Sequence, residues 1–248
     1  MTILTDETEI RKIRGSGRII KEIFDWLKDN IREGISTAAL DREIETIIRQ
    51  KGGEPAFKGY RGYPASSCVS VNEVVVHGIP SDRIILKDGD IVSIDIGVRK
   101  NDYFTDAART FALGGVSEEA RKLIRVTEKS LCEGMSKAVV GNSISDISGA
   151  IERTIRKSGY QEVRTFVGHG TGRELHESPE IPNWREKGRG STRLKKGLVL
   201  AIEPMVNIGT REVRILADGW TAVTKDGKLS AHFEHTVIVG KGKAEALT

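Results

Sequence analysis

The feature that most constrains the fold of this chain is the segment 91–113, IVSIDIGVRKNDYFTDAARTFAL, which carries an acid in each of two apolar arms. The arms flank Arg99-Lys100-Asn101-Asp102, a polar cluster typical of a reversing turn. A turn centred on the middle of this cluster places Asp95 directly opposite Asp106, where like charges destabilise the pair. The hairpin therefore predicts a cation between the two acids. A turn displaced by one residue, with one acid in solvent, is the alternative.

The composition is that of a globular protein with a sizeable core. The chain has 248 residues, 38% of them hydrophobic, enough for one large domain or two small ones. The net charge of +4 and the pI near 9.0 arise from lysines and arginines spread among acids, which suits an anionic partner without identifying one. Cys68 and Cys132 lack the spacing of a structural zinc site and fit a reducing compartment. With no signal peptide and no bilayer-spanning apolar run, we expect a cytoplasmic protein without a membrane partner.

The order of the expected elements repeats once along the chain. Apolar residues at helical spacing, with caps and glycine stops, predict helices over residues 6–34, 36–53, 117–135 and 143–159. The second helix can begin at Ser36 or Thr37 and the fourth at Ser143 or Ser145. Apolar and β-branched runs predict strands over 66–76, 91–113, 163–167, 198–206, 212–216, 220–225 and 232–239. This order predicts an α+β fold in which helices cover one face of a mostly antiparallel sheet. We expect one domain, 1–248, with one continuous sheet and halves of about 1–115 and 116–248.

Two further acids interrupt apolar strands. Glu203 lies within LVLAIEPMV and Glu234 within AHFEHTVIVG. Either acid alone is explained by a salt bridge at a strand end. Together with the two hairpin acids they imply a metal or matched cations, because unpaired buried carboxylates are costly. Arg109 and Arg214 are the candidate matched cations.

A histidine framed by glycines is the fifth candidate. His169 lies in FVGHGTG, where the glycines permit tight turns and close backbone approach. Its alternative role is that of a hydrogen-bonded loop histidine, and no GxxxxGK[ST] phosphate loop is present. Several carboxylates with one imidazole suit manganese, iron(II), cobalt(II) or zinc. The number of donors predicts a pair of metals roughly 3.5–4 Å apart that activates a water for hydrolysis.

With these residues assembled, the chain resembles the type I methionine aminopeptidases over essentially its full length. The motifs that carry the resemblance are VNEVVVHGIP, DGDIVSIDIGV, DAARTF, GHGTGRELHE, LAIEPMV and DGWTAVTKDGKLSAHFEHT. The resemblance implies the pseudo-twofold pita-bread fold, a curved and mostly antiparallel sheet with helices on its outer face. It also implies that Asp95, Asp106 and Glu234 hold one metal, that Asp106, His169, Glu203 and Glu234 hold the second, and that Asp106 and Glu234 bridge the two.

The resemblance assigns roles in catalysis as well. It implies that a metal-activated water attacks the scissile amide and that Glu203 is the general base. His77 and His176 are implied to contact the substrate and to stabilise the oxyanion, although each is an ordinary loop histidine by sequence alone. The free α-amine of the peptide is implied to bind at the second metal, which accounts for exopeptidase action.

An apolar pocket is implied for the methionine side chain. Its expected lining consists of Tyr60, Tyr63, Cys68, Leu175 and Trp220. Aromatic rings make favourable contacts with a thioether, although each of these residues could equally belong to the core. Many family members have phenylalanine at the position of Leu175 and cysteine at that of Phe57, so the pocket shape is expected to differ. A narrow entrance is expected to admit only small second residues such as alanine, glycine or serine.

The chain resembles the short bacterial form of the family, without the zinc-binding extension or helical insertion of some relatives. The expected substrates are the N-termini of nascent polypeptides, and the protein is expected to be monomeric. Its mild positive charge suggests work at the ribosome surface, with no specific nucleic-acid sequence. Two competing interpretations are a peptidase of the same fold that cleaves Xaa-Pro bonds and a non-catalytic pita-bread module that binds peptide, histone or nucleic acid.

Overall fold

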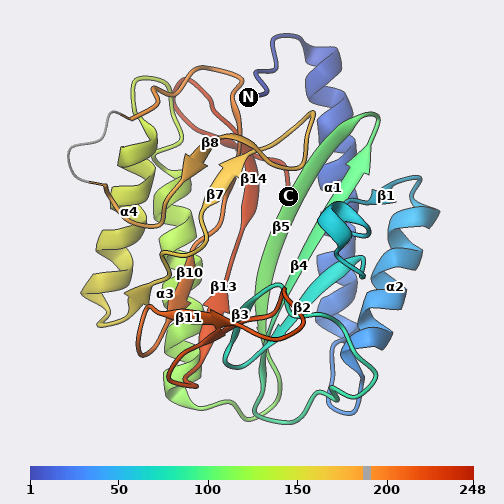
Figure 1. Cartoon of the computed structure of the whole chain (residues 1–248). Coiled ribbons are helices and arrows are strands. Elements are labelled where there is room, and N and C mark those ends of the chain that lie inside the picture. Colours follow the sequence, from blue (N-terminus) through green and yellow to red (C-terminus); the bar gives the residue numbers. More distant parts are fainter. Residues whose placement is uncertain (187–190) are drawn as a thin grey trace.

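Four capped helices flank the strands in the computed structural model, which describes residues 1–186 and 191–248 (Figure 1). They are α1 (Glu7–Asn30), α2 (Thr37–Gln50), α3 (Glu118–Met135) and α4 (Ile144–Lys157). Side chains of the residue before each helix, Asp6, Ser36, Ser117 and Ser143, bind backbone N–H groups of the first turn, as N-caps do. The predicted starts are confirmed, whereas α1 ends before the predicted stop at Gly34.

The strands are short, apart from one long hairpin. The hairpin is formed by β4 (Ile91–Lys100) and β5 (Tyr103–Ala112). The others are β1 (Glu54–Pro55), β2 (Ser67–Val71), β3 (Val74–Val76), β6 (Gln161–Glu162), β7 (Gly168–Gly170), β8 (Glu177–Ile181), β9 (Val199–Ile202), β10 (Met205–Asn207), β11 (Val213–Ile215), β12 (Ala222–Thr224), β13 (Ser230–His232), β14 (His235–Ile238) and β15 (Glu245–Ala246), with the 3-10 turn η1 at Tyr60–Gly62. All pairs of named strands in the described part of the chain are antiparallel.

The prediction of one continuous sheet is wrong in detail. The strands form four sheets, with orders β1-β4-β2 (β5 also pairing with β4), β13-β10-β6, β11-β12-β3 and β15-β14-β9-β7-β8. Reciprocal backbone hydrogen bonds between Ala108 and Glu234, of 2.9 and 3.3 Å, join the hairpin sheet to the break between β13 and β14. The two halves therefore meet at the acids predicted to hold metal. The single-domain boundaries stay a prediction.

Three predicted strands are broken in two, and two of the breaks have a local cause. Residues 66–76 divide into β2 and β3 at Asn72, whose φ of 54° lies in the left-handed region. Residues 198–206 divide at Glu203-Pro204, where proline has no N–H for the ladder. Residues 232–239 divide at Phe233-Glu234, and in both of these cases the chain passes from one sheet to another. The strand predicted over 163–167 is absent, since β6 ends at Glu162 and the chain crosses to β7.

The register of the hairpin corrects the predicted pairing of its acids. Asp95 pairs with Ala108, and Asp106 pairs with Gly97. The two-residue turn is Asn101-Asp102, with φ of 53° and 64°, as a type I′ turn requires. The centre of the turn is thus displaced by one residue, but this shifts the pairing by two positions and keeps both acids on the same face. The acids are diagonal neighbours, and the alternative with one acid in solvent is wrong as well.

Each pair of helices covers its own part of the strands. In Figure 1, α1 and α2 lie on one side of the molecule and α3 and α4 on the other, with the strands between them. One core cluster packs Phe24 and Leu27 of α1 and Leu40 of α2 against β4, and another packs α3 and α4 against β9, β10 and β14. Burying a side chain of the size of Phe24 contributes about 1.5–3 kcal/mol. Packing against these helices therefore fixes the position of the strands that carry the acids.

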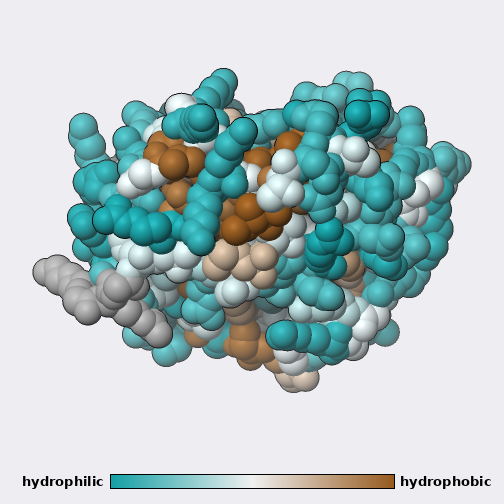
Figure 2. Space-filling view, turned by 90° about the horizontal axis from the view of Figure 1, so that it is seen from above, coloured by the Kyte–Doolittle hydropathy of each residue, from teal (hydrophilic) through white to brown (hydrophobic). Residues whose placement is uncertain are grey.

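The surface is mostly polar. Figure 2, seen from the top of Figure 1, shows a largely hydrophilic face with a hydrophobic group near its centre. Among the residues described, the large hydrophobic side chains that are exposed are few: Met1, Ile84, Ile85, Val140 and Ile215. No helix within 1–186 or 191–248 combines the length and the apolar character needed to cross a membrane.

Candidate metal centre and substrate cavity

A cavity of about 160 Å³ lies where the two halves meet. Its walls come from the hairpin, from the segment around η1, and from the strands of the second half. The lining residues are Phe57, Tyr60, Arg61, Tyr63, Cys68, His77, Asp95, Asp106, His169, His176, Glu203, Trp220 and Glu234. All five residues predicted to hold metal are among them, although they are widely separated in the sequence.

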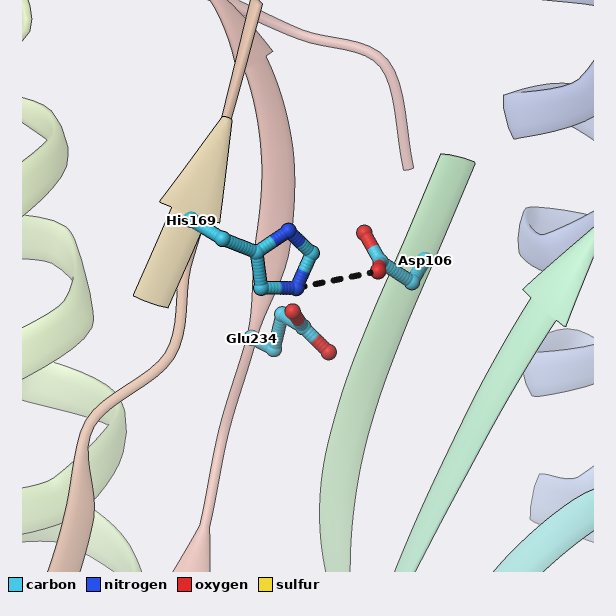
Figure 3. A group of neighbouring side chains, drawn as sticks. All are labelled: Asp106, His169 and Glu234. Atoms are coloured by element: carbon cyan, nitrogen blue, oxygen red, sulfur yellow. Dashed lines mark ion pairs between the residues drawn. The ribbon is translucent and has the colours of Figure 1, made fainter. Parts of the chain in front are cut away.

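Three of the five form the centre of the cluster (Figure 3). Asp106 from β5, His169 from β7 and Glu234 from the break before β14 each offer a ligand atom, and these atoms lie within 4.8 Å of one another. All three side chains are buried. The Nε2 atom of His169 is 3.5 Å from Oδ2 of Asp106 and 3.6 Å from Oε1 of Glu203. Glu203 therefore joins the cluster from the break after β9.

Neighbouring groups orient these side chains. The Nδ1 atom of His169 donates to the carbonyl of Gly170 at 2.9 Å, which leaves Nε2 to face the acids. The hydroxyl of Thr236 accepts from the backbone N–H of Asp106 at 3.0 Å and lies 2.9 Å from its Oδ1. Such outer contacts fix the tautomer of a ligating imidazole and the orientation of a ligating carboxylate.

No lysine or arginine in the described part of the chain forms an ion pair with the acids of the cluster. Burial and mutual repulsion raise the pKa of Asp95, Glu203 and Glu234 well above their usual range, and burial raises the pKa of Asp106 to about 6. Within residues 1–186 and 191–248 their ion-pair partners are histidines alone. The Oδ1 atom of Asp95 is buried, and no described residue offers it a hydrogen bond.

The alternative of matched arginines is wrong. The guanidinium of Arg109 lies 4.7 Å from the ring centre of Phe24, and Arg214 is exposed on β11. An oxygen-rich group with one imidazole and an orphaned buried carboxylate oxygen fits a hard divalent cation. The residues present therefore suit the metal chemistry predicted from the sequence.

Comparisons with known proteins agree with this chemistry. The model of metallopeptidase family M24 matches residues 11–241. A methionine aminopeptidase of Clostridium perfringens is 52% identical over 248 residues, covering 100% of this chain and 99% of that protein. The chain belongs to metallopeptidase family M24, among its methionine aminopeptidases. Methionine aminopeptidase 1 of Bacillus subtilis is 48% identical, again over 100% of this chain and 99% of the relative.

Solved structures confirm the predicted pita-bread fold class. Methionine aminopeptidase from Rickettsia prowazekii superposes with a TM-score of 0.96 at 36% identity, covering 100% of this chain and 99% of that one. Prolidase from Pyrococcus furiosus superposes with a TM-score of 0.80 at 24% identity, and the match covers 99% of this chain but 65% of the prolidase. The likeness to prolidase shows the shared fold alone.

Both histidines that the family resemblance assigns to the substrate line the cavity of this M24 chain. The Nδ1 atom of His176 lies 3.0 Å from the hydroxyl of Tyr60, and its ring centre is 4.2 Å from that of His169. The ring of His77 meets Phe166 edge-on, with centres 5.2 Å apart. Burial lowers the pKa of His77 and of His176 to about 4, the latter with help from His169. Both imidazoles are therefore neutral at pH 7 and can donate one hydrogen bond each.

Four of the five residues expected to surround a methionine side chain line the cavity, and their role in binding stays a prediction. Tyr60, Tyr63, Cys68 and Trp220 line the cavity, and Tyr63 meets Trp220 edge-on with ring centres 5.1 Å apart. Leu175 does not line it, because its side chain is 2% exposed and faces the interior. Phe57 lines the cavity instead. In the sequence it was noted only as a departure from the family pattern.

Sequence reasoning missed two neighbours of the cluster. His232 is buried, and its Nε2 lies 3.7 Å from Oε2 of Glu203, with no hydrogen-bond partner among the residues described. Its position two residues before Glu234 in AHFEHT was the available signal, because alternate residues of an extended segment share a face. Arg61 lines the cavity from η1 with φ of 50°. Its guanidinium lies 5.3 Å from the ring centre of Tyr60, and no sequence pattern marked it.

Proposed function

We propose that this M24 chain removes the N-terminal methionine from nascent polypeptides whose second residue is small, using two divalent metal ions. The observation that carries this proposal is the convergence of four acids and one histidine on one cavity, without lysine or arginine partners in the described part of the chain. The names and full-length similarity of the relatives support the same activity.

The five cluster residues are proposed to hold the metals. Asp95, Asp106 and Glu234 would bind one ion, and Asp106, His169, Glu203 and Glu234 would bind the other. When bound, such ions lower the pKa of a water molecule and polarise a carbonyl group, whether they are cobalt, manganese, iron(II) or zinc. A pair of ions also offsets the repulsion among carboxylates that burial otherwise makes costly.

The residues around the cluster are proposed to carry the protons and hold the peptide. Glu203, at the cavity wall, accepts a proton from the attacking water and passes it to the leaving amine. His77 and His176, both neutral, donate hydrogen bonds to the scissile carbonyl as negative charge develops on its oxygen. The anionic end of the cavity suits a free α-amine, which an internal peptide bond lacks.

The aromatic wall is proposed to select methionine. Tyr60, Tyr63, Cys68 and Trp220 offer rings and a sulfur atom to a thioether side chain, with Phe57 beside them. A cavity of about 160 Å³ leaves little room for a bulky second residue. We propose that the protein acts as a cytoplasmic monomer, and that its charge of +4 favours encounters with nascent chains at the ribosome.

A peptide panel on the metal-loaded protein tests the function. We expect release of methionine from Met-Ala-Ser, little release from Met-Leu-Ser, and no cleavage of Ala-Pro. Metal analysis of the same sample is expected to give two ions per chain. Preferential cleavage of the Xaa-Pro bond would support the alternative peptidase, and absence of metal binding would support the non-catalytic module.

A further inference from the structure

The loop that carries His176 is held by hydrogen bonds to the carboxylate of Glu177. His176 ends the segment 171–176 between β7 and β8, and its side chain is only partly buried at the cavity, so burial alone does not fix its position. A partly exposed loop side chain samples several rotamers unless its backbone and its partners restrict it. The geometry of this loop therefore decides where the imidazole lies.

Glu177, the next residue, closes the loop on itself. Its side chain is only 7% exposed. Its Oε1 atom accepts hydrogen bonds from the backbone N–H groups of Arg173 and Glu174, at 2.9 and 3.0 Å. It also accepts from the hydroxyl of Thr2 at 2.7 Å. Burial would raise the pKa of Glu177, but the Met1 amine and these hydrogen bonds hold it below its usual range, so an ionised carboxylate ties the loop together.

The partner of this carboxylate is itself anchored. Thr2 is 5% exposed, and its carbonyl accepts from the N–H of Val199, the first residue of β9, at 3.1 Å. A Cβ atom at Gly172 would come within 2.7 Å of the Thr2 side chain, so the loop packs directly on this segment. Thr2 thus connects the loop to the strand that precedes Glu203.

Two further contacts hold the start of the loop. The N–H of Phe104 donates to the carbonyl of Gly172 at 2.7 Å, and the guanidinium of Arg173 donates to Oε1 of Glu9 in α1 at 2.6 Å. The far end, at His176, has the hydroxyl of Tyr60 as its polar partner. Glu177 directly follows His176, and its carboxylate binds back to Arg173 and Glu174 near the anchored start of the loop.

We propose that Glu177, braced by Thr2, is a positioning residue that sets His176 against Tyr60 and the substrate. This inference rests on the proposed role of His176 in peptide hydrolysis. Glu177 does not line the cavity, so it acts through the loop backbone and not by contact with the substrate.

A double-mutant cycle on the metal-loaded protein tests it. We expect Glu177→Ala to lower kcat for Met-Ala-Ser by about 10- to 100-fold, since three hydrogen bonds to a charged acceptor are lost. In a His176→Ala background the same change is expected to cost less than about twofold, because residues that act through one another are not additive. Thr2→Val is expected to lower kcat by about threefold, and Thr2→Ser to restore it.

The matched control is Glu174→Gln, which removes the same charge from an exposed side chain of the same loop and should leave kcat unchanged. As a second readout, the 15N resonances of the His176 imidazole should shift in Glu177→Ala and Thr2→Val but not in the control. Equal losses in both backgrounds, or unshifted resonances, would overturn the inference. If Glu177→Ala does not fold, Thr2→Val enters the cycle in its place. Failure of the wild-type protein to cut Met-Ala-Ser would refute the proposed function instead.

Discussion

Buried acids occur at two places in this molecule, Glu162 and the cavity, and their negative charge is balanced differently at each place. Glu162 in β6 is fully buried, and the guanidinium groups of Arg156, Arg164 and Arg211 lie 2.9, 2.8 and 3.6 Å from its Oε1. The acids around the cavity have histidines for neighbours and no such cations in the described residues. Arginine side chains of the chain itself balance the charge of Glu162. The cavity acids lack such partners in the described residues, and they suit metal ions from solution.

The pKa shifts follow this difference. Burial would raise the pKa of Glu162, but hydrogen bonds from Arg156 and Arg164 hold it below its usual range. Burial raises the pKa of the cavity acids without any such compensation. The comparison teaches that a buried carboxylate without a matched arginine is the stronger sign of a functional site.

The largest expected effect is on activity. Asp106→Asn and His169→Ala should each lower kcat/KM by about 10³-fold or more, because each removes a central member of the cluster. Glu162→Gln should leave kcat/KM within about twofold of the wild type, because Glu162 does not line the cavity. Initial rates of methionine release, with metal content measured in parallel, check the contrast. Normal turnover by either cluster variant would refute the assigned ligands.

Asp95→Asn and Glu162→Gln are expected to change stability in opposite directions, by smaller amounts. In the metal-free protein Asp95→Asn should raise the free energy of unfolding by about 1 kcal/mol, since it relieves repulsion among buried acids. Glu162→Gln should lower it by about 1–3 kcal/mol, since charged hydrogen bonds are lost. Added manganese should stabilise the wild type more than Asp95→Asn, by mass action. Thermal unfolding with and without chelator measures all three, and the same sign for both variants would break the comparison.

The smallest expected effect is on the pH dependence of stability. The pKa of Asp106 in the folded protein is raised from 3.8 to about 6, so its favourable contribution is complete below the unfolded value and is lost as pH rises through the folded value. The stability of Asp106→Asn relative to the metal-free wild type should therefore grow as pH rises through about 6. The pKa of Glu162 is lowered, so the deficit of Glu162→Gln should shrink as pH falls below its unfolded value of 4.5. Chemical denaturation across this pH range tests both slopes, and parallel slopes would contradict them.

The helix caps could be predicted from local sequence. The hairpin turn was misplaced, although local sequence also specifies it. The caps at Asp6, Ser117 and Ser143 follow from residue type and position. The turn at Asn101-Asp102 could have been placed correctly, because these residue types tolerate the left-handed conformation that a two-residue hairpin turn requires. Its misplacement did not affect the outcome, since both acids keep the same face.

The errors over the arginines and Leu175 differ in kind. Arg109 is three residues from Asp106, so the alternation of β5 directs it to the opposite face, toward α1. That could have been deduced from the strand period. By contrast, Leu175 faces the interior and Phe57 the cavity because of how distant segments pack, for which no local pattern exists.

The sequence by itself determined which side chains are candidates for the chemistry, because acids in apolar strands and a histidine among glycines stand out from their immediate neighbours. Only the tertiary structure decided that they converge. Glu203 and Glu234 enter the cavity where the chain passes from one sheet to another. His169 meets them through the pairing of β7 with β9, and Asp106 through the backbone hydrogen bonds between Ala108 and Glu234. Such convergence depends on contacts between residues far apart in the chain, and the free energy of those contacts is set by packing that no single segment encodes.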